Sequence, residues 1–371
     1  MVKRTTTRSH HKSRRLDDRL LIAYLITLAV GLVVVYSTSS MIAESRFGSH
    51  LFFFKNQVIW SILSLIAIAV IVRIDLERFA VYSWPLFILT LGMLAMVFLM
   101  PARNESQRWL FLGPFTVQPS ELFKFVMIYY LAFSLANRNR DITKLKQFFF
   151  PYVPMIGAGL LLIVLEPDLG TTIVIFATAV TLFFLAGAKI KHLVVAAVPT
   201  VTAAAVLVFG LGYKEERVTK YMSAILDPLQ GSYQSTQAAL TLGAGGFFGA
   251  GLGDGRQKLF FLPYPHTDFI FAAAGEELGF LGSMVLLGLL GYMIYRGFKI
   301  AYAQPDRFGY LLAAGMTLSL FINIAVNIGV VTSLLPVTGL PLPFISYGGS
   351  SLLISSVAIG VLLNLSRRVQ V

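Results

Sequence analysis

Long apolar runs recur along this chain from residue 20 to residue 366, with short polar breaks between them. A run of about 20 apolar residues is long enough to cross the ~30 Å hydrocarbon core of a bilayer as a helix. Charged residues make up only 13% of the chain, about half the usual share, and cannot cover the surface of a soluble protein. The predicted fold class is an all-α polytopic membrane protein with about ten transmembrane helices, at 20–40, 54–73, 79–99, 118–137, 147–165, 169–187, 190–212, 268–296, 307–332 and 344–366.

The Lys and Arg residues indicate how the chain is oriented. About two thirds of the 30 basic residues lie in the N-terminal tail and in alternate loops. The positive-inside rule then predicts that both termini are cytoplasmic and that the loop 213–267 is extracytoplasmic. We expect a basic tail at 1–19, one membrane domain at 20–366 that includes this loop, and a short cytoplasmic tail at 367–371. The first run follows basic residues but has no Ala-x-Ala cleavage site, so we expect an anchor and not a signal peptide.

Composition excludes several kinds of chemistry. The chain has no cysteine, which rules out disulfides, thiol catalysis and Cys-ligated metals. It has five His residues, two of them in the N-terminal tail, so the sequence does not favour a multi-His metal site. The net charge of +12 is typical of nucleic-acid binding in soluble proteins, but in a membrane protein basic residues first report topology. We therefore expect no nucleic-acid partner.

The large loop contains two unusual segments. Residues 215–227 place apolar side chains at helical spacing, which predicts an amphipathic helix lying either on the bilayer or on the protein itself: Val218, Tyr221, Met222, Ile225 and Leu226. Residues 243–255 contain seven glycines. They form either a close-packed turn or a backbone cradle for a diphosphate. The segment has no Gly-Lys-Ser/Thr ending and no preceding strand, so the turn is favoured.

Charged groups at membrane depth are costly and are candidate functional residues. Glu121 and Lys124 lie three residues apart at the start of the fourth run, on one face of the expected helix. They form either a structural ion pair or a site in which the Lys is shared with an anionic substrate. Arg108 and Trp109 add a cation and an aromatic ring a little upstream.

Three further carboxylates lie where apolar runs begin or end. Glu166 and Asp168 form the tight connection between two runs, and Asp168 is well placed to cap the helix that follows. Asp268 follows His266 and Thr267, where the polar loop becomes the eighth run. Each Asp is either a helix cap or a functional carboxylate.

The segment 339–351 interrupts the helical pattern just before the last run. It contains Pro341 and Pro343, which cannot lie inside a helix without kinking it, and a Gly-Gly pair that loosens the backbone. Non-helical backbone at membrane depth is tolerated where it is buried in protein or lines a cavity. We expect the segment to line a cavity, with freed backbone N–H donors that could hold an anion; the alternative is a kinked helix start.

Four motifs together resemble the SEDS family, the bacterial proteins of shape, elongation, division and sporulation. They are Gln-Pro-Ser-Glu-x-x-Lys at 118–124, Glu-Pro-Asp-Leu-Gly-Thr-Thr at 166–172, Pro-His-Thr-Asp-Phe-Ile-Phe-Ala with Gly-Glu-Glu-Leu-Gly at 265–279, and Pro-Leu-Pro-x-Ile-Ser-Tyr-Gly-Gly-Ser at 341–350. The resemblance runs from about residue 18 to residue 368. The Arg-Gln-Lys-Leu stretch at 256–259 and Ser350-Ser351 favour the division branch over the elongation branch. Thr116 stands where the family often has a basic residue, which weakens a phosphate contact there.

The resemblance implies an enzyme that polymerises lipid II on the outer face of the bacterial cytoplasmic membrane, at the division septum. It implies a class B penicillin-binding protein, a transpeptidase, as partner, together with other membrane proteins of the divisome. It implies no organic cofactor, and allows a divalent cation, Mg²⁺ or Mn²⁺, to help stabilise the diphosphate. Asp268 would be the general base. The expected substrate-binding residues are Glu121, Lys124, Arg108, Trp109, Asp168, His266, Ser346 and Ser350.

Three other functions are compatible with the sequence. A lipid II flippase would also need buried charges and broken helices. An elongation-specific polymerase and a non-catalytic division scaffold are the other two. By the same resemblance the partner would bind along spans eight and nine. Leu286, Leu290 and Met293 lie at helical spacing there, facing either the partner or the interior of the bundle.

Overall fold

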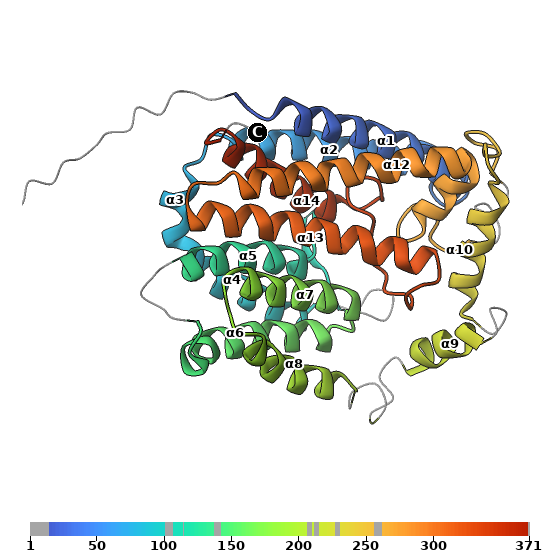
Figure 1. Cartoon of the computed structure of the whole chain (residues 1–371). Coiled ribbons are helices and arrows are strands. Elements are labelled where there is room, and N and C mark those ends of the chain that lie inside the picture. The colour runs from blue at the N-terminus through green and yellow to red at the C-terminus, as the bar shows by residue number, and fades with distance from the viewer. Residues whose placement is uncertain are drawn as a thin grey trace, which may run out of the picture.

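A computed structural model describes residues 15–100, 107–113, 115–136, 142–205, 210, 215–226, 231–255 and 262–369. Long helices run side by side through most of this structure (Figure 1). The helices of the first half are α1 (Asp18–Phe47), α2 (Phe52–Ile71), α3 (Leu76–Phe79), η1 (Ala80–Tyr82), α4 (Ser83–Val97), α5 (Pro119–Ala136), α6 (Leu145–Leu165) and α7 (Leu169–Leu185). Those of the second half are α8 (Ile190–Ala205), α9 (Glu215–Leu226), α10 (Tyr233–Ala244), α12 (Ile270–Tyr302), α13 (Arg307–Val331) and α14 (Gly349–Ser366). A short antiparallel hairpin, β1 (Leu110–Leu112) and β2 (Phe115–Val117), precedes α5.

The predicted all-helical membrane fold is confirmed, because helices form most of the described part of each range expected from hydropathy. Among the described residues, six helical stretches are long and apolar enough to cross a bilayer: α1, α2, 76–97, α12, α13 and α14. The remaining bundle helices are shorter, broken or carry charges. In α6 the backbone leaves helical geometry at Phe150, and α5 carries Glu121 and Lys124. The number of spans and their orientation stay predictions.

Helix α13 lies near the centre of the bundle and contacts α5, α7, α12 and α14. Small residues allow these helices to approach closely, as is usual where lipid replaces water and packing holds the helices together. A Cβ atom on Gly315 of α13 would lie 2.6 Å from the side chain of Ile128 in α5. The same atom would lie 3.1 Å from Leu182 in α7. Gly315 therefore fixes the distance between three helices.

A buried ion pair joins three distant parts of the chain. The Asp17 carboxylate caps α1 by accepting a hydrogen bond from the Leu20 amide, at 3.0 Å. It also accepts from the Arg296 guanidinium of α12, with Nη2 at 2.6 Å and Nε at 3.1 Å. The Asp17 amide donates to the Ser366 hydroxyl at the end of α14. Both charged side chains are buried, so this pair locks the start of α1 against α12 and α14.

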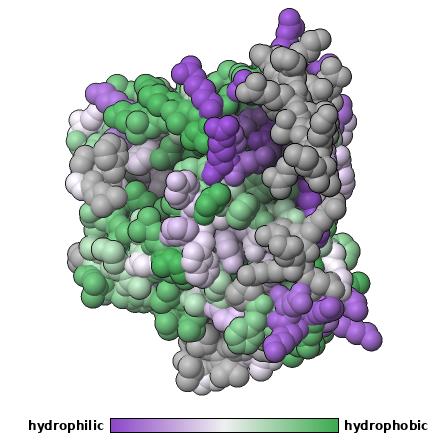
Figure 2. Space-filling model, turned by 90° about the vertical axis from the view of Figure 1, so that its left-hand side faces the viewer, coloured by the Kyte–Doolittle hydropathy of each residue, from purple (hydrophilic) through white to green (hydrophobic). Residues whose placement is uncertain are grey.

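The outer surface suits contact with lipid. Large apolar side chains are exposed along α1, α2, α4 and α12, for example Ile26, Ile66, Leu89 and Val285. Figure 2 views the end of the bundle where the chain terminates, with hydrophilic residues gathered over part of that end and hydrophobic residues beside them. This distribution is typical of a protein whose sides face acyl chains and whose ends face water.

Helices α9 and α10 lie outside the bundle, at the end where α12 begins and α13 finishes (Figure 1). The hydroxyl of Tyr221 in α9 donates to the Leu334 carbonyl at 2.7 Å, so this helix rests on the protein through that residue. Met222 next to it is 57% exposed. The predicted helix is confirmed over Glu215–Leu226, while its position on the bilayer or on the protein stays a prediction.

Candidate active site

The segment between α13 and α14 is non-helical, as predicted, and is hydrogen-bonded to the segment that precedes α12. The Ser346 hydroxyl donates to the Thr267 carbonyl and accepts from the Leu342 amide, both at 2.7 Å. The Tyr347 amide donates to the His266 carbonyl at 2.9 Å. The structure thus brings the third and fourth sequence motifs together at one end of the bundle.

Two buried amide side chains hold these segments in place, and the sequence analysis missed both. Asn327 of α13 donates from Nδ2 to the Asp268 carbonyl at 2.9 Å and to the Leu340 carbonyl at 2.7 Å. Gln57 of α2 donates from Nε2 to the Ser346 carbonyl at 3.1 Å. Both amides are almost fully buried. A lone amide within an apolar run is the sequence signal that could have found them, because burying one without a partner is costly.

Asp268 does not cap the helix that follows it. Helix α12 begins at Ile270, and its N-cap position is Phe269, where no side chain caps the helix. The predicted alternative that Asp268 is an N-cap is therefore wrong. The carboxylate lies beside the turn at Gly339, where an added Cβ atom would be 3.6 Å from Asp268 Oδ2. Asp268 is partly exposed, so a ligand at this end of the bundle can reach it.

Asp168 is the N-cap of α7, as predicted. Its Oδ1 accepts from the Thr171 amide at 3.1 Å, and its Oδ2 accepts from Gln118 Nε2 at 2.9 Å. Gln118 immediately precedes α5, so this buried carboxylate ties the start of α5 to the start of α7. Both oxygens of Asp168 are engaged in holding two helix ends together.

Arg108 braces the turn between α6 and α7. Its Nε donates to the Glu166 carbonyl at 2.9 Å, and its Nη2 donates to the Pro167 carbonyl. Its Nη1 makes no hydrogen bond within the part of the chain that the structure describes. Trp109 follows it, partly buried, where the β-hairpin begins. Arg108 therefore positions the turn and keeps one donor available.

Glu166 is fully buried in this turn, between α6 and α7. Neither of its carboxylate oxygens has a hydrogen-bond partner among the described residues. The pKa of Glu166 is raised to about 8, mainly by burial and also by the nearby Asp168 charge, against which Arg108 acts. Below that pH the side chain is mainly a neutral acid, so it adds no negative charge to the site.

Glu121 and Lys124 form the predicted ion pair inside the bundle. Lys124 Nζ lies 2.8 Å from Glu121 Oε2, and the side chains are 6% and 2% exposed. Helix α5, which carries both residues, packs against α4, α13 and α7. The pair is confirmed, while a contact between Lys124 and substrate stays a prediction.

The segment 338–340 links the two carboxylate-bearing regions. A Cβ atom on Gly170, in the first turn of α7, would lie 2.9 Å from Leu340 Cγ and 3.0 Å from the Thr338 carbonyl. Gly339 in the same segment lies against Asp268. All four sequence motifs therefore converge around 338–340 and the hydrogen bond that joins Gln118 to Asp168.

His266 and Ser350 border this region. The His266 ring lies 4.6 Å from the Phe53 ring. Burial and, to a smaller extent, the Arg46 charge lower the pKa of His266 to about 4. The imidazole is therefore neutral at physiological pH. The Ser350 hydroxyl at the start of α14 is buried and has no hydrogen-bond partner among the described residues. It is one of the few donors in this region not already used by the protein.

The glycine-rich segment forms a close-packed turn and not a diphosphate cradle. The Ala250 amide donates to the Glu276 carbonyl at 2.9 Å, and the Gly251 amide donates to the Glu277 carbonyl at 3.1 Å. These carbonyls lie where α12 breaks at Gly279, which has φ +68°. Any side chain on Gly249 would collide with the Glu277 carbonyl. The glycines are thus explained by packing against the broken helix.

One predicted partner contact is wrong. Leu286, Leu290 and Met293 are only 3%, 1% and 3% exposed, so they pack inside the bundle. The exposed apolar residues of α12 include Val285 and Tyr295. Helical spacing located one face of the helix correctly but could not tell the interior from the lipid side.

Within the described residues, no group of three or more His, Asp or Glu side chains is placed to hold a metal ion. Asp168 already accepts two hydrogen bonds, and Glu166 is a buried neutral acid below about pH 8. Asp168 and Glu166 therefore do not form a ligand set for a divalent cation.

The fold and the site define a polytopic membrane protein whose polar machinery gathers at one end of a helical bundle. A family model described as cell cycle protein, for FtsW, RodA and SpoVE, matches residues 18–371. This chain belongs to that family, which confirms the resemblance to the SEDS proteins.

Relatives match the chain over almost its full length. Stage V sporulation protein E of Bacillus subtilis (strain 168) is 40% identical over 355 residues, which cover 95% of this chain and 97% of that protein. The probable peptidoglycan glycosyltransferase FtsW of Geobacter sp. (strain M18) is 39% identical over 360 residues, covering 95% and 97%.

Two solved structures share the fold. A chain from a peptidoglycan synthase complex, described as coordinating polymerization and crosslinking, has a TM-score of 0.78 and 28% identity, covering 95% of this chain and 98% of that one. The crystal structure of the Thermus thermophilus rod shape determining protein RodA has a TM-score of 0.69 and 27% identity, covering 95% and 97%.

Proposed function

We infer that this chain is a peptidoglycan glycosyltransferase that polymerises lipid II on the outer face of the bacterial cytoplasmic membrane. Family membership and relatives named as probable peptidoglycan glycosyltransferases support this activity. The structural observation that carries it is Asp268, a partly exposed carboxylate that is not a helix cap and lies against the non-helical 338–340 segment. A flippase would have no need of a general base at this place.

The reaction is a single displacement at an anomeric carbon. Asp268 takes the proton of the acceptor 4-hydroxyl while that oxygen forms a bond to C1 of the donor sugar. The bond between C1 and the diphosphate oxygen breaks, and its electron pair leaves with the undecaprenyl diphosphate. The donor is α-linked and the product is β-linked, so the anomeric centre inverts and no covalent enzyme intermediate is required. Asn327 positions the base by holding its backbone carbonyl.

The departing diphosphate needs positive charge. Lys124 is the buried cation, with Glu121 using one of its three N–H donors and leaving others for phosphate oxygens. Arg108 offers its Nη1 from the neighbouring turn. The starts of α5 and α7 add the positive ends of two helix dipoles, because the bond from Gln118 to Asp168 holds them together.

The other predicted residues divide into contacts and supports. Ser350 has an unused hydroxyl that can donate to the substrate, and Trp109 offers an aromatic face to a sugar ring. Ser346 and Asp168 support the site. The Ser346 hydroxyl is bonded to the Thr267 carbonyl, and the Asp168 carboxylate accepts from Gln118. His266 stays neutral and packs on Phe53, so we assign it a supporting role as well.

A class B penicillin-binding protein is the proposed partner, since a structural relative forms part of a complex described as coordinating polymerization and crosslinking. We place its contact on the exposed side of α12, around Val285 and Tyr295. Several relatives named FtsW support a role in division, at the septum with other divisome proteins. The relative named stage V sporulation protein E makes peptidoglycan synthesis during sporulation the second candidate.

The test is polymerisation of lipid II by the purified chain in detergent, with and without a class B penicillin-binding protein. Detergent has no two sides, so polymer formation separates an enzyme from a flippase. Asp268→Asn should lower the rate by about 10² or more, the usual share of general base catalysis. Asp306→Asn is the matched control, because Asp306 is a true N-cap of α13 and Asn caps equally well. Equal loss in both variants, or none in Asp268→Asn, would remove Asp268 from the mechanism.

A further inference from the structure

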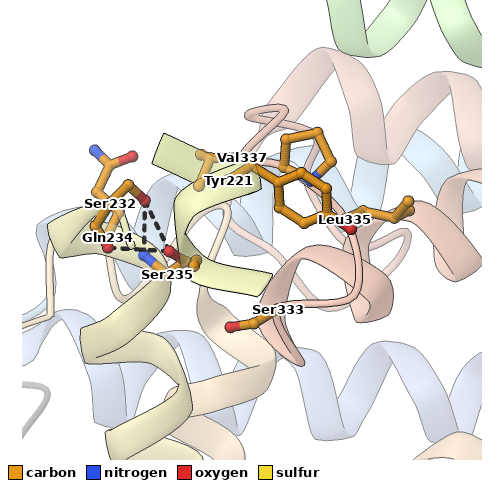
Figure 3. A pocket seen from close by; sticks show the side chains of 9 residues that line it. Tyr221, Ser232, Gln234, Ser235, Ser333, Leu335 and Val337 are labelled. Carbon is orange, nitrogen blue, oxygen red and sulfur yellow. Dashed lines mark hydrogen bonds between the residues drawn. The ribbon is translucent and has the colours of Figure 1, made fainter. Parts of the chain in front are cut away.

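The segment 231–253 contains no Asp, Glu, Lys or Arg, although it lies in the loop predicted to be extracytoplasmic. About six charged residues would be expected in a stretch of this length at the usual share of one quarter. The segment comprises α10 and the glycine-rich turn at 245–253. Helix α10 begins at the Ser232 cap, where the Ser235 amide donates to the Ser232 hydroxyl at 3.2 Å (Figure 3). Its composition suits an apolar environment and not open water.

Large apolar side chains project from this turn. Phe248 is 79% exposed, and Phe247 and Leu252 are more than half exposed. The Phe247 ring lies 5.1 Å from the Phe248 ring and stacks on the Phe280 ring of α12 at 5.8 Å. Phe280 is exposed as well, so the three rings form one exposed aromatic cluster. Exposed apolar clusters mark places of contact with a membrane or another protein.

The aromatic cluster continues the outer side of a helix that is long and apolar enough to cross a bilayer. Leu281 and Met284 follow Phe280 on α12 and are exposed. The exposed Lys299 lies near the other end of α12, 20 residues from the break at Gly279. At 1.5 Å per residue this separation is about 30 Å, the thickness of the hydrocarbon core. The turn therefore joins α12 at the level where acyl chains meet headgroups.

The backbone of the turn is already paired with α12. Two amides of the turn donate to carbonyls just before the break, and two amides just after the break donate to carbonyls of the turn. These bonds run from Ala250 to Glu276, from Gly251 to Glu277, from Phe280 to Gly246 and from Leu281 to Phe247, at 2.9–3.2 Å. Unpaired backbone groups are costly in hydrocarbon, and non-helical backbone is tolerated there where the protein satisfies it. This pairing allows the turn to enter the apolar layer.

We propose that the glycine-rich turn is a bilayer anchor, with Phe247, Phe248 and Leu252 inserted among the acyl chains of the leaflet on the active-site side. A lipid surface fits because the segment has no charge and its aromatic cluster continues the outer side of α12 at interfacial depth. The turn also clamps the start of α12, which closely follows Asp268. The anchor therefore fixes the level of Asp268 relative to the membrane surface, whichever reaction takes place there.

Site-directed spin labelling tests the anchor. The chain has no cysteine, so single-Cys variants of the full chain can be labelled without background and reconstituted in phosphatidylcholine vesicles. Power saturation compares accessibility to oxygen, which concentrates in lipid, with accessibility to a water-soluble nickel chelate. The label at Phe248→Cys should favour oxygen, like the lipid-side control Ile66→Cys on α2, where Ile66 is exposed. The water-side control Ser45→Cys, exposed between two charged residues of α1, should favour the chelate.

A charge on the turn gives a second readout. Phe248 is mostly exposed, so Phe248→Asp should leave the fold intact, and Phe248→Leu is the matched control. Each Phe side chain withdrawn from water favours the inserted turn by about ten-fold or more. A label at Leu252→Cys should therefore become accessible to the chelate when combined with Phe248→Asp and stay in lipid when combined with Phe248→Leu.

Three results would overturn the anchor. The first is a label at 248 that favours the chelate as strongly as the label at 45. The second is a label at 248 shielded from both reagents, which would indicate that protein covers the turn. The third is a label at 252 that Phe248→Asp leaves unchanged. None of these measurements uses lipid II, so failure of the proposed function would not alter them.

Discussion

The ion pair between Glu121 and Lys124 allows structural and functional roles to be separated by a double substitution. Lys124 Nζ lies 2.8 Å from Glu121 Oε2. At an effective dielectric constant of about 20, that distance corresponds to an attraction of about 6 kcal/mol. Burying both ions costs several kcal/mol for each, so the net contribution of the intact pair to stability is small.

Removing one partner is different from removing both. Lys124→Met leaves the Glu121 carboxylate buried without its cation, and breaking such pairs typically costs about 3–5 kcal/mol. The double variant Glu121→Gln with Lys124→Met replaces the pair by neutral side chains of similar size. We expect the double variant to unfold in detergent at nearly the wild-type temperature, and Lys124→Met to unfold at a clearly lower one.

Activity should follow a different order from stability. If Lys124 stabilises the departing diphosphate, lipid II polymerisation falls by about 10²-fold or more in both the single and the double variant. Glu121→Gln alone keeps the cation and should retain much more activity. A double variant that is stable and polymerises at the wild-type rate would refute the assignment and leave the pair with a purely structural role.

Three further predictions concern stability and packing. Arg296→Met should destabilise the protein by about 3–5 kcal/mol in thermal unfolding, because Asp17 stays buried without its cation; wild-type stability would contradict this. Gly249→Ala should reduce the yield of folded protein in gel filtration, since its side chain would collide with the Glu277 carbonyl; normal yield would show that the turn can shift. The pKa of Glu166 is raised to about 8, so the folded state binds more protons than the unfolded state above about pH 4.5, and stability falls as pH rises toward 8. Glu166→Gln should therefore raise the unfolding temperature at pH 8 and lose this advantage near pH 4.5; a pH-independent difference would refute a buried neutral acid.

Short-range sequence patterns predicted the helices, one ion pair and one helix cap. Runs of apolar residues located the bundle helices, because a helix facing lipid or other helices must be apolar over its whole length. The three-residue spacing predicted the bond between Glu121 and Lys124. Asp168 ahead of a small-residue helix start predicted the cap on α7.

Contacts between distant segments could not be predicted in this way. Gln57 donates to the carbonyl of Ser346, which is 289 residues away, and no local pattern indicates which carbonyl a buried amide will meet. The sequence also does not show whether an apolar face of a helix points into the bundle or out of it. Leu290 and Val285 lie on one helix, yet Leu290 is buried in the bundle and Val285 is exposed on its outer side. Lipid chains are as apolar as the protein interior, so hydropathy does not distinguish the two sides.

Asp168, Glu166 and Asp268 carry the same chemical group, but the structure gives each carboxylate a different environment. Asp168 has both oxygens committed to Thr171 and Gln118, so it serves to hold helix ends. Glu166 is fully buried and its raised pKa keeps it mainly protonated, so it cannot accept a proton from a sugar hydroxyl at neutral pH. Asp268 is the one of the three that is partly exposed, and its backbone is fixed by Asn327 while its helix is left uncapped. A general base must be reachable and held in place, and this combination of environments selects Asp268.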